Sequence, residues 1–167
     1  MKDISVLSVE VGEALSERGL MLATAESCTG GWVAQAVTSV AGSSRWFERG
    51  FVTYANVAKQ EMLGVDAKTL ALFGAVSEAA VREMAAGAIS HSHADIALSV
   101  SGIAGPGGGS EDKPVGTVWF GWAVREGETS ALRLALHGDR QTIRRQAVGA
   151  ALEGVLKIVG HGSLSCG

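Results

Sequence analysis

The fold is decided by residues 20–31, which read LMLATAESCTGG. The first five form a short, largely apolar run, which is typical of a strand buried on both faces. A helix is expected to begin within residues 27–29, because the next apolar residues share one helical face: Trp32, Val33, Ala36, Val37 and Val40. A strand-to-helix junction of this kind lies at the carboxyl edge of a sheet, where open α/β folds bind ligands. The stretch therefore predicts a layered α/β fold and the position of a functional site.

The rest of the chain continues to alternate helices with strands. Helical spacing and N-cap residues indicate helices over 4–15, over 56–63 capped by Asn56, after Asp66, over 78–91 capped by Ser77, and after Asp139. Apolar or alternating runs indicate strands over 51–54, 96–101, 115–124 and 131–136, the last two joined as an antiparallel hairpin. We predict one three-layer α/β/α domain over residues 1–160, with a mixed sheet, helices on both faces and a frayed tail at 161–167.

Composition excludes several classes of protein. The 167 residues carry 14 basic and 17 acidic side chains, a net charge of −3, which gives no basic excess for holding nucleic acid. No apolar run approaches the roughly 20 residues of a membrane span, and the first residues lack the apolar core of a secretion signal. Two cysteines make no disulfide framework, and no spacing of Cys, His or carboxylates indicates a metal site. We expect a cytoplasmic protein that needs no metal or other cofactor.

The junction at residues 24–31 is the first candidate for chemistry. Ser27 and Cys28 are both possible nucleophiles, and Gly30 and Gly31 let a ligand approach the backbone closely. The alternative is an ordinary helix cap with tight packing. A serine needs a base, but the four histidines fall at element ends or in the tail, positions typical of surface histidines. The remaining base is a lysine with a lowered pKa, and Lys59 stands in the first turn of a helix, where the dipole disfavours a cation.

Two further segments favour an anionic ligand. Six of the 23 glycines and both prolines fall within residues 101–116, a long loop whose amides could wrap a ligand rather than act as a mere crossover. Three arginines stand in the first turns of the last helix, where positive charge is unfavourable unless an anion such as phosphate binds there: Arg140, Arg144 and Arg145. A solvated helix face capped by Asp139 is the alternative explanation of that cluster.

Together these segments resemble the CinA C-terminal domain family, whose stand-alone members are nicotinamide-nucleotide amidohydrolases. The resemblance runs from about Val11 to the last helix and rests on residues 24–31, 50–54 with Asn56 and Lys59, 74–77, 101–117 and 138–140. It implies hydrolysis of the carboxamide of nicotinamide mononucleotide to the acid, with release of ammonia, as a step of pyridine nucleotide salvage. It also implies that Ser27 is the nucleophile and Lys59 the base, in agreement with the argument from the missing histidine.

The remaining site residues are expected to surround this pair. We expect Tyr54 to tune or position Lys59. Amides of residues 29–31 or 102–105 are expected to hold the oxyanion, and one of the three arginines the phosphate. The full expected substrate-binding set is Thr29, Gly30, Gly31, Asn56, Ser101, Gly102, Ala104, Gly105, Arg140, Arg144 and Arg145.

Two other functions compete with this hypothesis. One is an amidase that uses Cys28 on a different amide. The other is a non-catalytic nucleotide-binding or regulatory module, as the family's association with competence and DNA damage suggests. Nucleic acid and membrane partners are not expected, whereas a homo-oligomer is.

Overall fold

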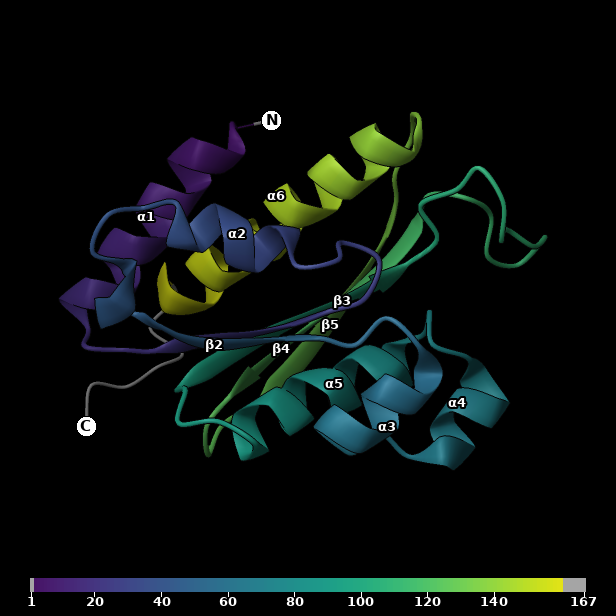
Figure 1. The fold of residues 1–167 in the computed structure, drawn as a ribbon, viewed down its shortest axis with the longest axis horizontal. Coiled ribbons are helices and arrows are strands. Elements are labelled where there is room, and N and C mark those ends of the chain that lie inside the picture. The colour runs from purple at the N-terminus through teal and green to yellow at the C-terminus, as the bar shows by residue number, and fades with distance from the viewer. Residues whose placement is uncertain (1, 161–167) are drawn as a thin grey trace.

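A five-stranded mixed sheet forms the centre of the molecule (Figure 1). The structure is a computed structural model and describes residues 2–160, so the predicted tail at 161–167 lies outside the described residues. The strand order is β2-β1-β3-β4-β5, with β1 parallel to β2 and β3, and β4 antiparallel to β3 and β5. The strands are β1 (Leu22–Glu26), β2 (Phe47–Val52), β3 (Ile96–Gly102), β4 (Thr117–Val124) and β5 (Thr129–Ala135).

Helices cover both faces of this sheet, which confirms the predicted three-layer arrangement (Figure 1). One layer contains α1 (Ile4–Glu17), α2 (Trp32–Thr38) and α6 (Arg140–Gly160). A short 3-10 turn at Ser43–Arg45 follows α2 and leads into β2. The other layer contains α3 (Asn56–Leu63), α4 (Ala67–Phe73) and α5 (Glu78–Ser90). Each layer has its own apolar core against the sheet, and all five residues of β1 are buried between them. This double burial explains the continuous apolar run in the sequence.

Several element ends differ from the sequence-based expectations. β2 begins at Phe47 rather than at residue 51, because Phe47, Arg49 and Gly50 also pair with β1, with a register shift between Leu22 and Ala23. α2 begins only at Trp32, since Gly30 and Gly31 both have positive φ and form a turn instead of helix. Asp66 and Ser77 cap their helices as predicted, and the Asp139 carboxyl accepts from the amide of Thr142.

The Asn56 cap was predicted wrongly. The N-cap of α3 is Ala55, so Asn56 is the first residue of the helix and is exposed at its start. Its side chain lines a pocket rather than bonding back to the helix amides.

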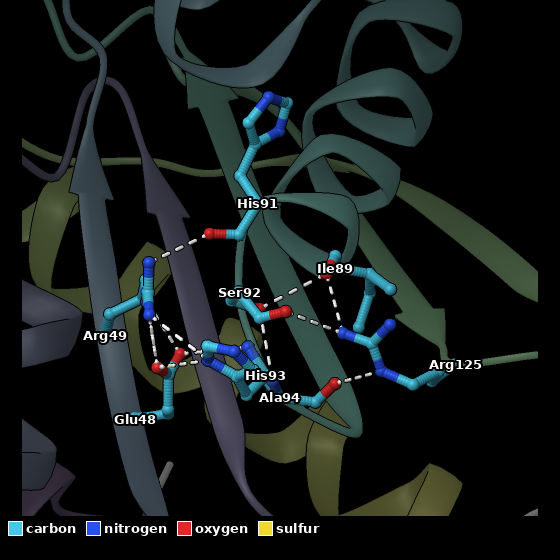
Figure 2. A network of polar contacts seen from close by, with 8 residues as sticks. All are labelled: Glu48, Arg49, Ile89, His91, Ser92, His93, Ala94 and Arg125. Atoms are coloured by element: carbon cyan, nitrogen blue, oxygen red, sulfur yellow. Dashed lines mark hydrogen bonds and ion pairs between the residues drawn. The ribbon is translucent and has the colours of Figure 1, made fainter.

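Polar contacts fasten the sheet edge at which β1, β2 and β3 begin (Figure 2). The guanidinium of Arg125, just after β4, donates to the main-chain oxygens of Ile89, Ser92 and Ala94 at 2.7–2.9 Å. Arg49 pairs with Glu48 at 2.6 Å and also donates to the oxygen of His91. These contacts hold the segment that links α5 to β3, at the edge of the sheet opposite to the carboxyl ends of β1, β2 and β3.

Candidate active site

A pocket of about 210 Å³ opens at the carboxyl edge of β1 and β3. The end of β1, the start of α3, the turn before α5, the end of β3 and the start of α6 all contribute to it. Its lining residues are Ser27, Cys28, Tyr54, Asn56, Lys59, Ala75, Val76, Ser101, Gly102, Ala104 and Arg140. Residues from three candidate segments that are far apart in the sequence therefore line one pocket.

Ser27 and Lys59 face each other in this pocket. The Nζ atom of Lys59 donates to the Oγ atom of Ser27 at 2.9 Å, and also to the main-chain oxygens of Thr53 at 2.9 Å and Tyr54 at 3.0 Å. The lysine is 1% exposed, and this burial lowers its pKa below the ordinary value of 10.5. A lysine of this kind can lose its proton and act as a base toward the serine hydroxyl.

The turn at residues 27–31 presents the serine. The amide of Ser27 donates to the oxygen of Val100 at 3.0 Å, which fixes the serine backbone to the end of β3. The amide of Gly30 then closes the turn onto the oxygen of Ser27, also at 3.0 Å. Because Gly30 (φ 59°) and Gly31 (φ 100°) adopt left-handed conformations, the chain can reverse into α2 directly behind the serine.

Cys28 lies next to the serine but is poorly suited to be the nucleophile. It is 6% exposed, and burial raises the pKa of its thiol to about 11. The thiol therefore stays protonated near neutral pH, whereas the thiolate is the nucleophilic form.

The three arginines of α6 have three different environments. Arg140 lines the pocket, and its Nη1 atom donates to the oxygen of Gly105 at 2.7 Å. Arg144 instead donates to the main-chain oxygens of the serine turn, and Arg145 lies in a separate hollow of about 440 Å³ beside Trp32. Only Arg140 among the three lines the pocket that contains the Ser–Lys pair.

Other predicted site residues also divide into two groups. Ser101, Gly102 and Ala104 line the pocket as expected, whereas Gly105 contributes a carbonyl to Arg140. Thr29 is fully buried, and its hydroxyl donates to the carboxyl group of Glu26 at 2.6 Å. Thr29, Gly30 and Gly31 are not among the residues that line the pocket, since the turn directs them toward α2.

Tyr54 contacts Lys59 through its main chain rather than through its phenol. Its oxygen accepts from Nζ, while the side chain is 61% exposed and its hydroxyl accepts from Nη2 of Arg140 at 3.4 Å. The phenol therefore belongs to the mouth of the pocket.

Three residues with clear roles here were not among the predicted site residues. Ala75 and Val76 form part of the pocket wall, and the motif at 74–77 was the only signal for them. Glu26 is 1% exposed, and its carboxyl oxygens accept from the amides of Val33 and Ala34 at 2.8 and 3.1 Å. It therefore anchors the first turn of α2, a role that spacing alone does not reveal.

The glycine-rich loop is held by the protein's own contacts. Lys113 donates to the oxygen of Phe73 at 2.6 Å, and Arg133 donates to the oxygen of Asp112 at 3.0 Å. Gly116 has φ 98°, and a Cβ atom there would overlap the carbonyl group of Leu136. Part of the glycine excess thus serves close approach within the chain, whereas the sequence suggested backbone open to a ligand.

Within residues 2–160, no group of three or more His, Cys, Asp or Glu side chains is arranged to hold a metal ion. No helix in the same range is both long enough and apolar enough to cross a membrane.

The family model of the CinA C-terminal domain matches residues 4–159. The chain belongs to the CinA C-terminal domain family. One relative in this family is the nicotinamide-nucleotide amidohydrolase PncC of Escherichia coli K12, 58% identical over 90% of this chain and 92% of the relative. Another is a CinA-like protein of Akkermansia muciniphila, 53% identical over 85% of this chain but only 34% of its own length. The family domain thus occurs both alone and as part of longer proteins.

Solved structures of CinA-family proteins have the same fold. The competence/damage inducible protein CihA of Agrobacterium tumefaciens superposes with a TM-score of 0.92 at 45% identity, covering 95% of this chain and 96% of that one. The competence damage-inducible protein A of Klebsiella pneumoniae gives the same TM-score at 44% identity, covering 96% and 99%. The predicted α/β architecture is therefore that of the family.

Proposed function

We propose that this protein hydrolyses the carboxamide of nicotinamide mononucleotide, giving nicotinate mononucleotide and ammonia. The observation that carries the proposal is the 2.9 Å contact between Lys59 and Ser27, made by a buried lysine in a pocket. The substrate is suggested by relatives named nicotinamide-nucleotide amidohydrolases, which align with nearly the whole chain.

The first half of the reaction forms an acyl-enzyme. Neutral Lys59 takes the proton of the Ser27 hydroxyl while Oγ forms a bond to the carboxamide carbon, and the carbonyl electron pair moves onto oxygen. When this tetrahedral intermediate collapses, the C–N bond breaks and Lys59 returns the proton to the departing nitrogen, so that ammonia leaves. This sequence requires the lysine to be neutral at the start, which its burial favours.

The second half releases the acid. Water takes the place of ammonia, Lys59 accepts one of its protons, and the new hydroxyl group bonds to the acyl carbon. The bond from Oγ to carbon then breaks, and the proton returns from Lys59 to Ser27. One lysine thus serves as base and then as acid in each half.

Some amides near Ser27 are already bonded, and others remain candidate donors to the oxyanion. The amides of Ser27, Gly30 and Trp32 already donate to main-chain oxygens. Cys28 directly follows Ser27 in the chain, and both Cys28 and Gly102 line the pocket. We assign the oxyanion to these two, by the logic that places the amide after the nucleophile in such a hole. Loss of one such donor typically costs about 3 kcal/mol of transition-state stabilisation.

The size of the pocket suggests how the nucleotide lies. Its volume of about 210 Å³ is below the roughly 300–1,000 Å³ of typical ligand pockets, so we place only the nicotinamide ring inside. The ribose phosphate then lies at the mouth, next to Arg140 and the hydroxyl of Tyr54. Arg140 is the arginine we assign to the phosphate, because arginine recognises phosphate oxygens through its paired N–H groups.

Ammonia release is the direct test. The purified protein is incubated with nicotinamide mononucleotide, nicotinamide riboside and nicotinamide, and ammonia is measured. We expect turnover of the mononucleotide that is abolished in Ser27→Ala and retained in Cys28→Ala. Activity that survives in Ser27→Ala but is lost in Cys28→Ala would assign the chemistry to the thiol. Tight binding of the mononucleotide without any ammonia would indicate the non-catalytic module.

A further inference from the structure

Arg144 is bonded to the protein's own main chain and is not placed to bind a substrate phosphate. Its Nε atom donates to the oxygen of Cys28 at 3.0 Å and its Nη2 atom to the oxygen of Thr29 at 3.1 Å. The guanidinium also lies over the ring of Trp32, with 5.4 Å between its carbon and the ring centre. This side chain, from α6, is thus bonded to the two residues that follow Ser27.

A second group holds the same turn. The buried carboxyl group of Glu26 binds the hydroxyl of Thr29 and the amides of Val33 and Ala34. Glu26 accepts hydrogen bonds from the turn and from α2, whereas Arg144 donates hydrogen bonds to the carbonyl oxygens of the turn. The serine turn is therefore held between an acidic and a basic side chain from different elements.

The turn needs such support because its own sequence specifies it weakly. Gly30 and Gly31 can adopt many backbone conformations, and fixing each of them costs conformational entropy. A displacement of about 1 Å at a catalytic group can reduce the rate about 10²-fold. The Ser27 hydroxyl, held 2.9 Å from Lys59, depends on this turn for its position.

We propose that Arg144 is a positioning residue, which clamps the carbonyls of Cys28 and Thr29 and so holds Ser27 against Lys59. This inference rests on the proposed Ser–Lys chemistry and removes Arg144 from the residues expected to bind phosphate. The clamp requires arginine, since its planar guanidinium bonds two successive carbonyls while lying over Trp32, whereas a lysine ammonium has no flat group to place there.

A matched control exists at the opposite edge of the sheet. Arg125 likewise binds main-chain oxygens, those of Ile89, Ser92 and Ala94, but it does so beside the starts of the parallel strands (Figure 2). Arg125→Met removes the same kind of contact as Arg144→Met without touching the serine turn. Any general effect of loosening the backbone should therefore appear in both variants.

The experiment compares Arg144→Met, Arg144→Lys and Arg125→Met with the wild type. Thermal unfolding, kcat and KM for nicotinamide mononucleotide are measured, together with the rate at which a fluorophosphonate labels Ser27. For Arg144→Met we expect kcat and the labelling rate to fall on the order of 10²-fold while KM stays within about twofold. Arg144→Lys should behave similarly, and Arg125→Met should lose thermal stability only.

Several outcomes would overturn the clamp. They are a rise in KM with unchanged kcat in Arg144→Met, full activity in Arg144→Lys, or an equal fall of kcat in Arg125→Met. Labelling separates this inference from the proposed function, because it requires no nucleotide. A wild type that releases no ammonia, but whose Ser27 labelling is slowed by Arg144→Met, would refute the substrate and support the clamp. A wild type that neither turns over nor labels would overturn both.

Discussion

The two edges of the parallel strands place cationic side chains in different environments. At the edge where the strands begin, Arg125 and Arg49 are largely exposed and bind carbonyls, and Arg49 also pairs with Glu48 at 2.6 Å (Figure 2). At the carboxyl edge, Lys59 is buried, and within residues 2–160 no carboxylate forms an ion pair with it. Its partners are one hydroxyl and two main-chain oxygens.

We interpret this difference as one between a structural cation and a reactive one. A cation with a carboxylate partner or with access to water remains charged, and it fastens loops at little cost. A buried cation without an anionic partner favours its neutral form, so its pKa falls. A buried lysine without an anionic partner is less favourable for folding than a paired or solvated one, and it lies at the edge where we place the chemistry.

The largest effect is expected from Lys59→Met. The substitution nearly preserves the shape of the side chain but removes the base, so kcat should fall on the order of 10³-fold or more. In the wild type, kcat/KM should rise with pH as Lys59 loses its proton and should level off below pH 10.5, the ordinary lysine pKa. Steady-state rates across pH check this; a residual rate in Lys59→Met with the same pH dependence would assign the base elsewhere.

Stability provides a second measurement on the same variant. Below its lowered folded pKa, Lys59 is charged in both the folded and the unfolded chain, and burial of that charge costs free energy. Between the folded pKa and 10.5 the folded chain binds fewer protons than the unfolded chain, so the wild type should gain stability relative to Lys59→Met as pH rises. Chemical unfolding of both proteins at several alkaline pH values measures the difference, which should stay constant if Lys59 is not perturbed.

A smaller effect is expected from Arg140→Met. If Arg140 binds the phosphate, KM for the mononucleotide should rise about 10- to 100-fold, since a charged hydrogen bond contributes roughly 1.5–3 kcal/mol. The riboside, which lacks the phosphate, should show little change. Steady-state kinetics with the mononucleotide and the riboside test whether Arg140 binds the phosphate. Equal losses on the two would instead mean that Arg140 acts through its bond to Gly105 on the shape of the loop.

The smallest effect on catalysis is expected from Arg125→Met. Its contacts with main-chain oxygens are mostly exposed, so the free energy of unfolding should fall by only about 1 kcal/mol. For a chain of this length that corresponds to a shift in Tm of roughly 2–4 °C. Calorimetry and kcat measure the two quantities. A clear loss of kcat would show that the two edges are coupled and would break the comparison between them.

Much of the fold and part of the site could be predicted from local sequence. The apolar run before Ser27, the caps at Asp66 and Ser77 and the alternation in the last strand depend on near neighbours, and all were predicted. The pairing of Ser27 with Lys59 was also predicted, from the lack of a suitable histidine and from the family resemblance. The errors fall where the tertiary fold overrides local patterns. Residues 47–50 join β2 although the sequence indicated a strand only from residue 51, and two left-handed glycines at 30 and 31 delay the start of α2.

The sequence by itself determined which residue types were available: a serine at a strand-to-helix junction, few lysines, a glycine-rich loop and three arginines near the start of one helix. Only the tertiary structure decided what each of them does. Burial lowers the pKa of Lys59 and raises that of Cys28, and neither residue's burial can be read from its neighbours in the chain. Arg140, Arg144 and Arg145 lie within six residues, yet they face a pocket, a turn and a separate hollow. Their roles differ because side chains on one helix point in different directions, and the packing of other elements determines what each one meets.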